Sequence, residues 1–224
     1  MYEASPGDTA RGAVVVVHEV FGVTSHIEDI VHRLSDAGWH AVAPNFFHRQ
    51  AISVFSYDDL SSALPVMNGL TAEGITDDVM AVLDHLESAG FSNGRVSFVG
   101  FCMGGTVTFY AGTMRQLAAA VTFYGGGVAA GRFGLASLLE LAPQLQTPWL
   151  GLYGDLDGSI PVGDVEELRR AASGADVPTE IVQYGDGKHG FHCNDRPDVF
   201  NRAAAADAWG RTLEWLDRYG AAGS

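Results

Sequence analysis

Residues 100–104 carry the side chain best suited to covalent chemistry. They read Gly-Phe-Cys-Met-Gly, the pattern G-x-S-x-G with cysteine in place of serine, and they follow an apolar run. Such a turn from strand to helix needs glycine at both ends, because side chains there would collide with the neighbouring strand and helix. The helix dipole also favours a thiolate at the first turn of a helix. We therefore interpret Cys102 as a nucleophile; the alternative is a buried cysteine in a glycine-rich turn.

Acidic residues and a histidine follow Cys102 in the order expected of a hydrolytic triad. The order nucleophile, acid, histidine, with long gaps, occurs in hydrolases whose three residues meet only in the folded chain. His189 could exchange the proton of the thiol, and an aspartate could fix its tautomer and stabilise the imidazolium. At this stage the aspartate is either Asp155 or Asp157. The alternative for His189 is a solvated loop residue.

Alternating strands and helices are expected to bring these residues together. Continuous apolar runs predict buried strands, and apolar residues at helical spacing predict helices between them. This alternation implies a mostly parallel central sheet with helices on both faces. Catalytic groups should lie beyond the carboxyl ends of the strands, where Glu19, Cys102 and His189 stand. The strand candidates are residues 13–18, 39–43, 95–100, 118–124, 148–153 and 179–184, whereas residues 50–74 have no clear assignment.

Composition and charge indicate a globular domain with no nucleic-acid or membrane partner. The chain has 224 residues, 47% of them hydrophobic, which suits a single domain over residues 1–224. The formal net charge of −14 would repel phosphate backbones and anionic membranes. Two cysteines are too few for a disulfide framework, and neither a signal peptide nor a membrane span is evident. We expect a cytoplasmic monomer that acts on a small molecule.

We expect no metal and no cofactor. His189, His192 and Cys193 are close in sequence but lack the spacing of a common zinc motif. His18 and Glu19 lack the second histidine of H-E-x-x-H, because residue 22 is glycine. The three glycines at 125–127 are not followed by the signal of a phosphate-binding loop, so they indicate a tight turn or part of the site wall.

Five stretches of the chain resemble the dienelactone hydrolase family of α/β-hydrolases. They read VVVVHEVFGV, GRVSFVGFCMGG, AVTFYGG, GLYGDLDGSIP and GKHGFHC, at residues 14–23, 94–105, 120–126, 151–161 and 187–193. They occur in the family's order and span nearly the whole chain. The resemblance implies an α/β-hydrolase fold and a carboxylic-ester hydrolase of the carboxymethylenebutenolidase type.

The resemblance also implies individual roles. The family's catalytic aspartate stands four residues before a proline, which selects Asp157 ahead of Pro161. A glutamate after the first inner strand, here Glu19, is implied to take the thiol proton when substrate binds; the alternative is a solvent-exposed carboxylate. Backbone N–H groups of Val20 and Met103 are implied to form the oxyanion hole, a feature that stabilises charge in the transition state.

A cysteine nucleophile restricts the substrates. A thiolate, with a reference pKa of about 8.5, leaves a tetrahedral intermediate more easily than a simple alkoxide or an amine does. Enol lactones, aryl esters and thioesters carry better leaving groups, so we expect lactones or activated carboxylic esters as substrates, through a thioester acyl-enzyme. The alternative is a non-catalytic, redox-sensing or ligand-binding relative that uses the same thiol.

The sequence departs from the family where its best-known members bind a substrate carboxylate with two arginines. One such arginine stands four residues after the histidine, where this chain has Cys193, and the other lies in the segment equivalent to residues 50–74, which contains no Arg or Lys. In residues 51–67 the apolar side chains indicate a more apolar wall over the site, and the alternative for about half of them is core packing; they are Phe55, Tyr57, Leu60, Leu64 and Met67. The candidates for the substrate pocket are Phe21, Phe55, Tyr57, Tyr124, Phe191 and Cys193.

Overall fold

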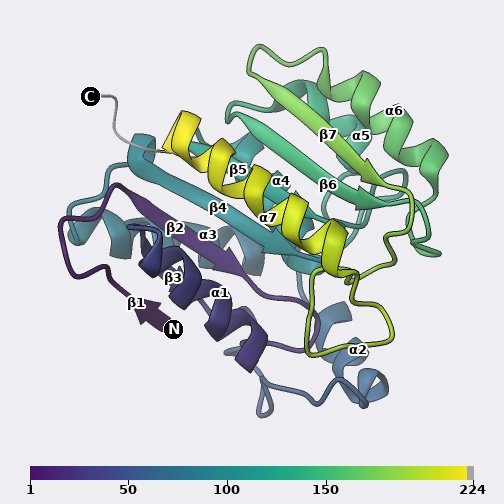
Figure 1. Ribbon diagram of the computed structural model, residues 1–224, viewed down its shortest axis with the longest axis horizontal. Helices are drawn as coiled ribbons and strands as arrows, with labels where there is room; N and C mark the ends of the chain where they lie inside the picture. The colour runs from purple at the N-terminus through teal and green to yellow at the C-terminus, as the bar shows by residue number, and fades with distance from the viewer. Residues whose placement is uncertain (221–224) are drawn as a thin grey trace.

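A seven-stranded sheet forms the centre of the computed structural model, which describes residues 1–220 (Figure 1). The strand order is β1-β3-β2-β4-β5-β6-β7; β1 is antiparallel to β3, and every other pair is parallel. The mostly parallel sheet predicted from the sequence is thus confirmed. The strands are β1 (Tyr2–Ala4), β2 (Ala13–Val17), β3 (His40–Ala43), β4 (Val96–Phe101), β5 (Ala119–Phe123), β6 (Trp149–Gly154) and β7 (Thr179–Tyr184).

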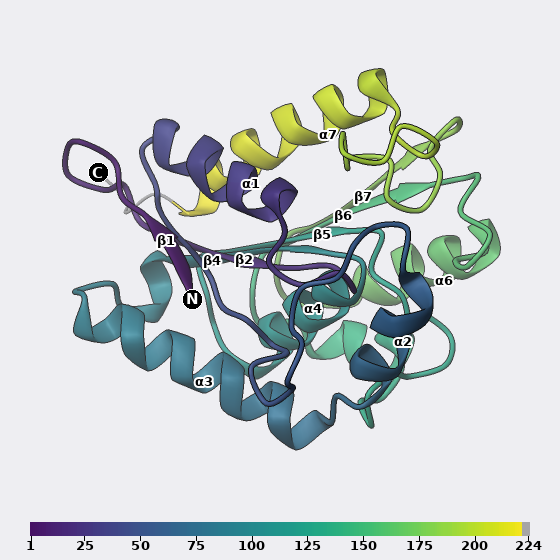
Figure 2. The same cartoon turned by 90° about the horizontal axis from the view of Figure 1, so that it is seen from below.

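Helices cover both faces of the sheet, as Figure 2 shows. One face carries α1 (Ser25–Asp36) and α7 (Arg202–Trp215), and the other carries α3 (Ala72–Ser88), α4 (Met103–Met114) and α6 (Val162–Ala172). All five residues of β2 are fully buried, which explains its unbroken apolar sequence. The shorter elements are α2 (Leu60–Asn68), α5 (Leu138–Leu141), 3₁₀ turns at Asn93–Arg95 and Ala142–Gln144, and a π-helical turn at Leu216–Gly220. Within residues 1–220 no helix has the length and apolar character needed to cross a membrane.

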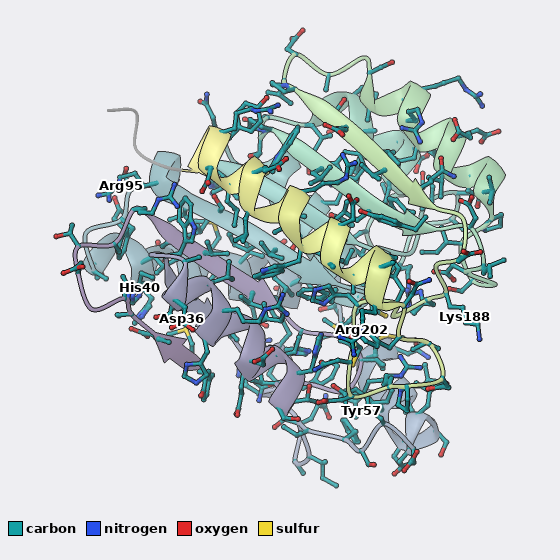
Figure 3. All side chains as sticks on the ribbon, viewed as in Figure 1. Asp36, His40, Tyr57, Arg95, Lys188 and Arg202 are labelled. Carbon is teal, nitrogen blue, oxygen red and sulfur yellow. The ribbon has the colours of Figure 1, made fainter. Side chains whose placement is uncertain are left out.

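Several short elements were not predicted from the sequence, and β1 and α2 are the two that matter for the sheet edge and the site. β1 is only three residues long and exists because it pairs with β3 at the edge of the sheet. α2 lies in the unassigned segment and is capped by Asp59, whose carboxylate accepts a hydrogen bond from the backbone N–H of Ser62. It lies at the carboxyl ends of the strands, the same end as Tyr57 and opposite to Arg95 (Figure 3).

The turn between β4 and α4 is too tight for side chains larger than hydrogen at its glycines. A Cβ atom on Gly104 would lie 2.2 Å from the carbonyl oxygen of Val17 and 2.6 Å from that of His18. Both contacts are with backbone, which cannot rotate away. The glycine therefore allows α4 to start against the end of β2, and this contact holds Cys102 at the edge of the sheet.

We predict that Gly104→Ala lowers the free energy of unfolding by at least about 2 kcal/mol, within the usual cost of overpacking. For a chain of this size the melting temperature should fall by roughly 5 °C or more. Gly210→Ala is the matched control, because Gly210 lies in α7 with open space at its Cβ position. That substitution should raise stability by about 0.5–1 kcal/mol through helix propensity. Equal melting temperatures for the two variants would contradict the steric account.

Candidate active site

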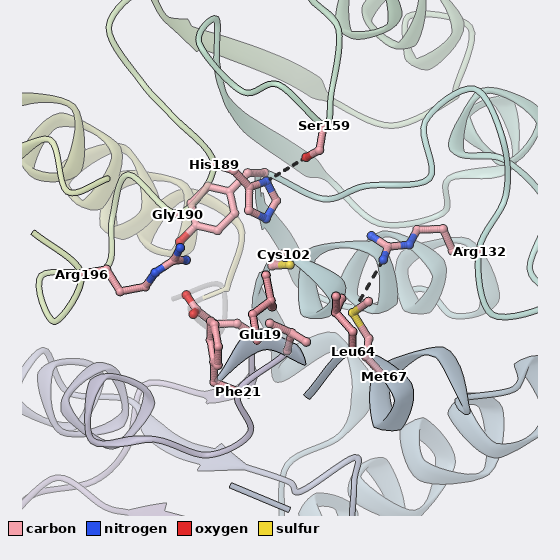
Figure 4. Close-up of a pocket in the computed structure, with 13 residues that line it drawn as sticks. Glu19, Phe21, Leu64, Met67, Cys102, Arg132, Ser159, His189, Gly190 and Arg196 are labelled. Carbon is pink, nitrogen blue, oxygen red and sulfur yellow. Dashed lines mark hydrogen bonds between the residues drawn. The ribbon is translucent and has the colours of Figure 1, made fainter. Parts of the chain in front are cut away.

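A cavity of about 260 Å³ opens at the carboxyl ends of the strands (Figure 4). It contains side chains from loops that are far apart in the sequence. Cys102, His189 and Glu19 face it together, as expected from the rule that parallel sheets place their sites at this edge. The lining residues are Glu19, Val20, Phe21, Leu60, Leu64, Met67, Cys102, Tyr124, Arg132, Ser159, His189, Gly190 and Arg196.

Cys102 occupies a strained position at the start of α4. Its φ of 56° and ψ of −117° are unusual for a residue with a side chain. Its backbone N–H donates to the carbonyl of Phe123 at 3.0 Å, and its own carbonyl accepts from Gly105 at 3.0 Å. These bonds fix the turn and point the thiol into the cavity. Cys102 is therefore half-buried and accessible to a small molecule, unlike a structural core cysteine.

Asp157 and His189 are brought together by contact between the loops after β6 and β7. The backbones of Gly154 and Gly187 touch, and the N–H of Leu156 donates to the carbonyl of Gly187 at 2.9 Å. The imidazole Nδ1 of His189 then lies 2.6 Å from Oδ2 of Asp157. Asp157 is the aspartate that bonds to His189, as the resemblance implied.

Ser159 orients the Asp157 carboxylate. The backbone N–H and the hydroxyl of Ser159 both donate to Oδ1 of Asp157, at 2.8 and 2.6 Å. Burial would raise the pKa of Asp157, but the hydrogen bonds from His189 and Ser159 outweigh it and lower the pKa. The carboxylate is thus charged at neutral pH, so Nδ1 of His189 carries a proton and Nε2 is directed at the thiol.

Cys102 and His189 shift each other's ionisation. Burial would raise the pKa of Cys102, yet the positive charge of His189 and its hydrogen bond to the thiol outweigh it and lower the pKa. Burial likewise opposes charge on His189, but the Cys102 thiolate and the Asp157 carboxylate raise its pKa to about 10. Each of the two groups thus favours the charged form of the other.

We predict that iodoacetamide alkylates Cys102 with a reactive pKa below the ordinary thiol value of about 8.5. His189→Gln should raise that pKa above the wild-type value, because the stabilising cation is lost. Glu19→Gln should leave it unchanged or lower it, because the charge of Glu19 raises the pKa of Cys102. Alkylation rates against pH, with peptide mapping to separate Cys102 from Cys193, measure the effect. A rise in Glu19→Gln but not in His189→Gln would identify Glu19 as the proton acceptor instead.

Glu19 is buried, with only 2% of its surface exposed, so it is not a solvent-exposed strand-end carboxylate. Among residues 1–220 neither carboxylate oxygen has a hydrogen-bond partner. Burial raises the pKa of Glu19, and the charges of His26 and Arg196 only partly offset it. Burial thus favours the neutral form of this carboxyl group over the charged one.

His18 fixes the backbone beside Glu19. Its Nδ1 donates to the carbonyl of Glu19 at 2.7 Å, and its Nε2 accepts from the N–H of Phe46 at 3.0 Å. Burial lowers the pKa of His18 to about 4, so the ring is neutral and can serve as donor and acceptor at once. Val20 follows and lines the cavity, whereas Met103, the buried first residue of α4, is not one of the lining residues. Within the described part of the chain, neither Val20 nor Met103 donates its N–H to a backbone carbonyl.

Only two of the six pocket candidates line the cavity. Phe21 and Tyr124 do so, and the Tyr124 ring lies 5.1 Å from that of His189. The cavity wall as described does not include Phe55, Tyr57, Phe191 or Cys193. Phe191 and Cys193 point into the core, and Tyr57 packs edge-on behind Phe21 at 4.8 Å. Of the residues predicted to form an apolar wall, Leu60, Leu64 and Met67 of α2 line the cavity.

Arg132 and Arg196 reach the cavity from opposite sides, and neither was predicted as a site residue (Figure 4). Each arginine side chain packs against a glycine, where a larger residue would collide with it. A Cβ on Gly126 would lie 2.6 Å from the Arg132 guanidinium, and a Cβ on Gly190 would lie 2.9 Å from the Arg196 guanidinium. Throughout residues 1–220 neither arginine has a carboxylate oxygen within 4.0 Å. Two arginines without a carboxylate partner in an acidic protein favour an anionic ligand.

Comparison with known proteins identifies the class. The sequence model described as "Dienelactone hydrolase family" matches residues 1–220, so the chain belongs to the dienelactone hydrolase family. A protein of Escherichia coli O157:H7 named "Putative carboxymethylenebutenolidase" is 39% identical over 229 residues, covering 98% of this chain and 82% of its own. The Salmonella typhimurium protein of the same name is 40% identical with the same coverage.

Solved structures agree on the fold. The crystal structure of a "Putative Dienelactone Hydrolase" from Klebsiella pneumoniae is 32% identical and has a TM-score of 0.84, covering 97% of this chain and 92% of that one. An acylaminoacyl peptidase of Pyrococcus horikoshii is 15% identical, with a TM-score of 0.73 over 99% of this chain and 39% of its own, so it supports the fold alone. The chain thus has the α/β-hydrolase fold and is a dienelactone hydrolase-like protein.

Proposed function

We propose that this protein is a cysteine-dependent hydrolase of lactones or activated carboxylic esters that carry an anionic group. The observation that carries the proposal is the series Cys102, His189 and Asp157, with its Nδ1–carboxylate bond of 2.6 Å, at the wall of a cavity. This series supplies a nucleophile, a proton carrier and an orienting anion.

The first half of the reaction would form a thioester. The Cys102 thiolate attacks the carbonyl carbon, and the carbonyl π electrons move onto oxygen to give a tetrahedral oxyanion. The N–H groups of Val20 and Met103 would bind that oxygen, a contribution of roughly 3–4 kcal/mol per donor to the transition state. Collapse expels the alcohol oxygen, which takes the proton from Nε2 of His189.

The second half would return the enzyme to its resting state. Neutral His189 takes a proton from water as the water oxygen attacks the thioester carbonyl. The second tetrahedral intermediate expels the Cys102 thiolate, and the carboxylic acid formed gives its proton to solvent. For a lactone both products are parts of one molecule, because the ring opens without releasing a fragment.

Glu19 would have a supporting role. The family resemblance implies that Glu19 accepts the proton of the Cys102 thiol when substrate binds. In the resting state His189 would be the better acceptor, because it is hydrogen-bonded to the thiol. A substrate anion that draws Arg196 away would remove one positive charge that stabilises ionised Glu19. Glu19 would then hold its proton more firmly and avoid repelling the substrate.

The anionic group is proposed from Arg132 and Arg196. Each can donate charge-assisted hydrogen bonds, which contribute about 1.5–3 kcal/mol apiece. These two arginines would serve in place of the pair that the sequence lacks at residue 193 and within 50–74. The walls between them, built by Phe21 and the apolar side chains of α2, suit the unsaturated carbon skeleton of an activated ester.

We predict that Arg132→Met and Arg196→Met each lower kcat/KM for a carboxylate-bearing aryl ester by about 10- to 100-fold, the loss of one charge-assisted contact. Neutral aryl esters of the same leaving group should change by less than about threefold, since neither arginine contacts them through charge. Arg170→Met, on exposed α6, is the control for loss of a positive charge. Equal losses on the charged and neutral esters would remove the arginines from substrate recognition.

The function itself is tested by a substrate panel. Turnover should be measured with enol lactones, aryl esters and thioesters, and with simple alkyl esters and peptides as the unreactive class. The proposal expects turnover to rise as the pKa of the leaving group falls. Comparable rates on ethyl and aryl esters would contradict a thiolate nucleophile. No turnover of any ester, together with loss of a reduced thiol in dilute peroxide, would favour the redox-sensing alternative.

A further inference from the structure

A second cluster of reactive side chains lies directly behind the cavity. It comprises Glu19 after β2, His26 in α1 and Cys193 after β7, all three buried. One ligand atom from each, a carboxylate oxygen, an imidazole nitrogen and the thiol sulfur, lie within 4.8 Å of one another. The proposed reaction uses neither His26 nor Cys193.

Two of the three groups in this cluster, Glu19 and His26, have buried polar atoms without a hydrogen-bond partner, whereas the Cys193 thiol contacts the Tyr57 hydroxyl and the backbone of Asp195. The imidazole Nδ1 of His26 lies 3.0 Å from Oδ1 of Asn194, and because an amide oxygen can only accept, Nδ1 carries the proton. In the neutral ring Nε2 then has a lone pair, and within residues 1–220 this buried atom has no hydrogen-bond partner. The same holds for both oxygens of Glu19. Unsatisfied buried groups are costly unless something binds them.

The arrangement around His26 is typical of a metal ligand. Histidines that bind metals usually donate the other ring N–H to an oxygen, which fixes the tautomer and the ring orientation. Asn194 performs that role here. The loop that carries Asn194 is itself held on α1, because the hydroxyl of Ser25 donates to Asp195 at 3.0 Å. Glu19, His26 and Cys193 are thus held by a frame that joins three separate segments.

We propose that Glu19, His26 and Cys193 form a binding site for a divalent transition metal of the zinc type. Thiolate, imidazole and carboxylate together suit Zn²⁺ better than Mg²⁺ or Ca²⁺, which prefer oxygen ligands. Bonds of about 2.0–2.3 Å in tetrahedral geometry place ligand atoms about 3.3–3.8 Å apart. Small side-chain rotations bring three atoms within 4.8 Å to that spacing.

Metal binding at this site would inhibit the proposed hydrolase activity. The ion displaces the protons of the Cys193 thiol and the Glu19 carboxyl, which pass to solvent, and no redox change is involved. Glu19 also lines the substrate cavity, so a bound ion would add positive charge and bulk beside Cys102. This consequence, inhibition of turnover by Zn²⁺, rests on the proposed function; the binding site itself does not.

Cobalt tests the site with a signal that needs no activity. Co²⁺ titrated into the reduced full-length protein should give the near-ultraviolet charge-transfer band of a thiolate–cobalt bond, saturating at one equivalent. The chain has two cysteines, so two variants decide which thiol binds. The band should persist in Cys102→Ser and vanish in Cys193→Ser, and His26→Gln should weaken binding at least about tenfold. Circular dichroism checks that each variant is folded.

Arg196 provides an independent test. Its charge lies close enough to Glu19 to stabilise the ionised carboxylate, so it repels a cation bound there. Arg196→Met should therefore tighten Co²⁺ binding, whereas Arg170→Met should not. The proposal is overturned if the band vanishes in Cys102→Ser and persists in Cys193→Ser, or if wild-type protein shows no saturable binding. A protein that hydrolyses no ester can still give the cobalt spectrum, so failure of the proposed function and failure of this site are distinguishable.

Discussion

Replacing Cys102 with alanine should reduce ester hydrolysis by at least about 10⁴-fold, because no other described side chain in the cavity can replace the thiolate. His189 would have no thiol to deprotonate, and water would have to attack the ester directly. The measurement is kcat/KM on a carboxylate-bearing aryl ester, at a pH where Cys102 is ionised.

The fold of this variant should be intact. Cys102 holds its turn through backbone hydrogen bonds, which alanine can also make. Loss of the thiol should leave the melting temperature within a few degrees of the wild-type value. An active Cys102→Ala protein, with turnover within about tenfold of wild type, would contradict a covalent mechanism at this residue.

Asp157→Asn should lower kcat by about 10⁴-fold, the effect known for the equivalent change in a serine hydrolase triad. The asparagine side chain is nearly the same size but can present its amide N–H to Nδ1 of His189. The imidazole would then carry its proton on Nε2, where it faces the thiol and cannot accept a proton. Steady-state kinetics at saturating ester measure the loss.

Asp155→Asn is the matched control for this prediction. Asp155 stands two residues away in the same turn, is exposed, and accepts a hydrogen bond from Gln183 at 3.1 Å. Its neutralisation should change kcat by less than about threefold. A larger loss for Asp155→Asn than for Asp157→Asn would reverse the assignment that the family resemblance made.

The positions of the nucleophile, acid and histidine could be predicted because each follows a strand whose carboxyl end is recognisable in the sequence. Cys102 and Asp157 follow the buried strands β4 and β6, and His189 follows the half-buried β7; parallel strands place their carboxyl ends at one edge of the sheet. The choice of Asp157 over Asp155 came from the family resemblance. In the structure Asp157 is the aspartate bonded to His189, and its catalytic role stays a prediction.

The arginines were not predictable in the same way. Arg132 and Arg196 lie in irregular loops, and the lengths of their side chains decide where the charges lie. The family resemblance placed the arginines that bind a substrate anion at residue 193 and within residues 50–74, where this chain has none. The signal that sequence reasoning missed was a glycine opposite each arginine, Gly126 and Gly190, and it has meaning only once the loops are folded.

The proposed metal site also could not be predicted from local sequence patterns. Sequence motifs detect ligands at short, regular spacing, and His189, His192 and Cys193 failed that test. Glu19, His26 and Cys193 come from three segments that meet only through the sheet, so no local pattern connects them. Four of the six pocket candidates do not line the cavity: Phe191 and Cys193 are buried, Tyr57 packs behind Phe21, and Phe55 packs against Phe47.

Acylation of Cys102 during turnover can be observed by mass spectrometry of the reacting enzyme. The protein is mixed with an aryl ester, quenched in acid within the burst phase and digested. We expect one added acyl group on the peptide that contains Cys102, in an amount equal to the phenol released in the burst phase. Turnover without any acyl adduct on that peptide, or an adduct on Cys193 instead, would contradict this expectation.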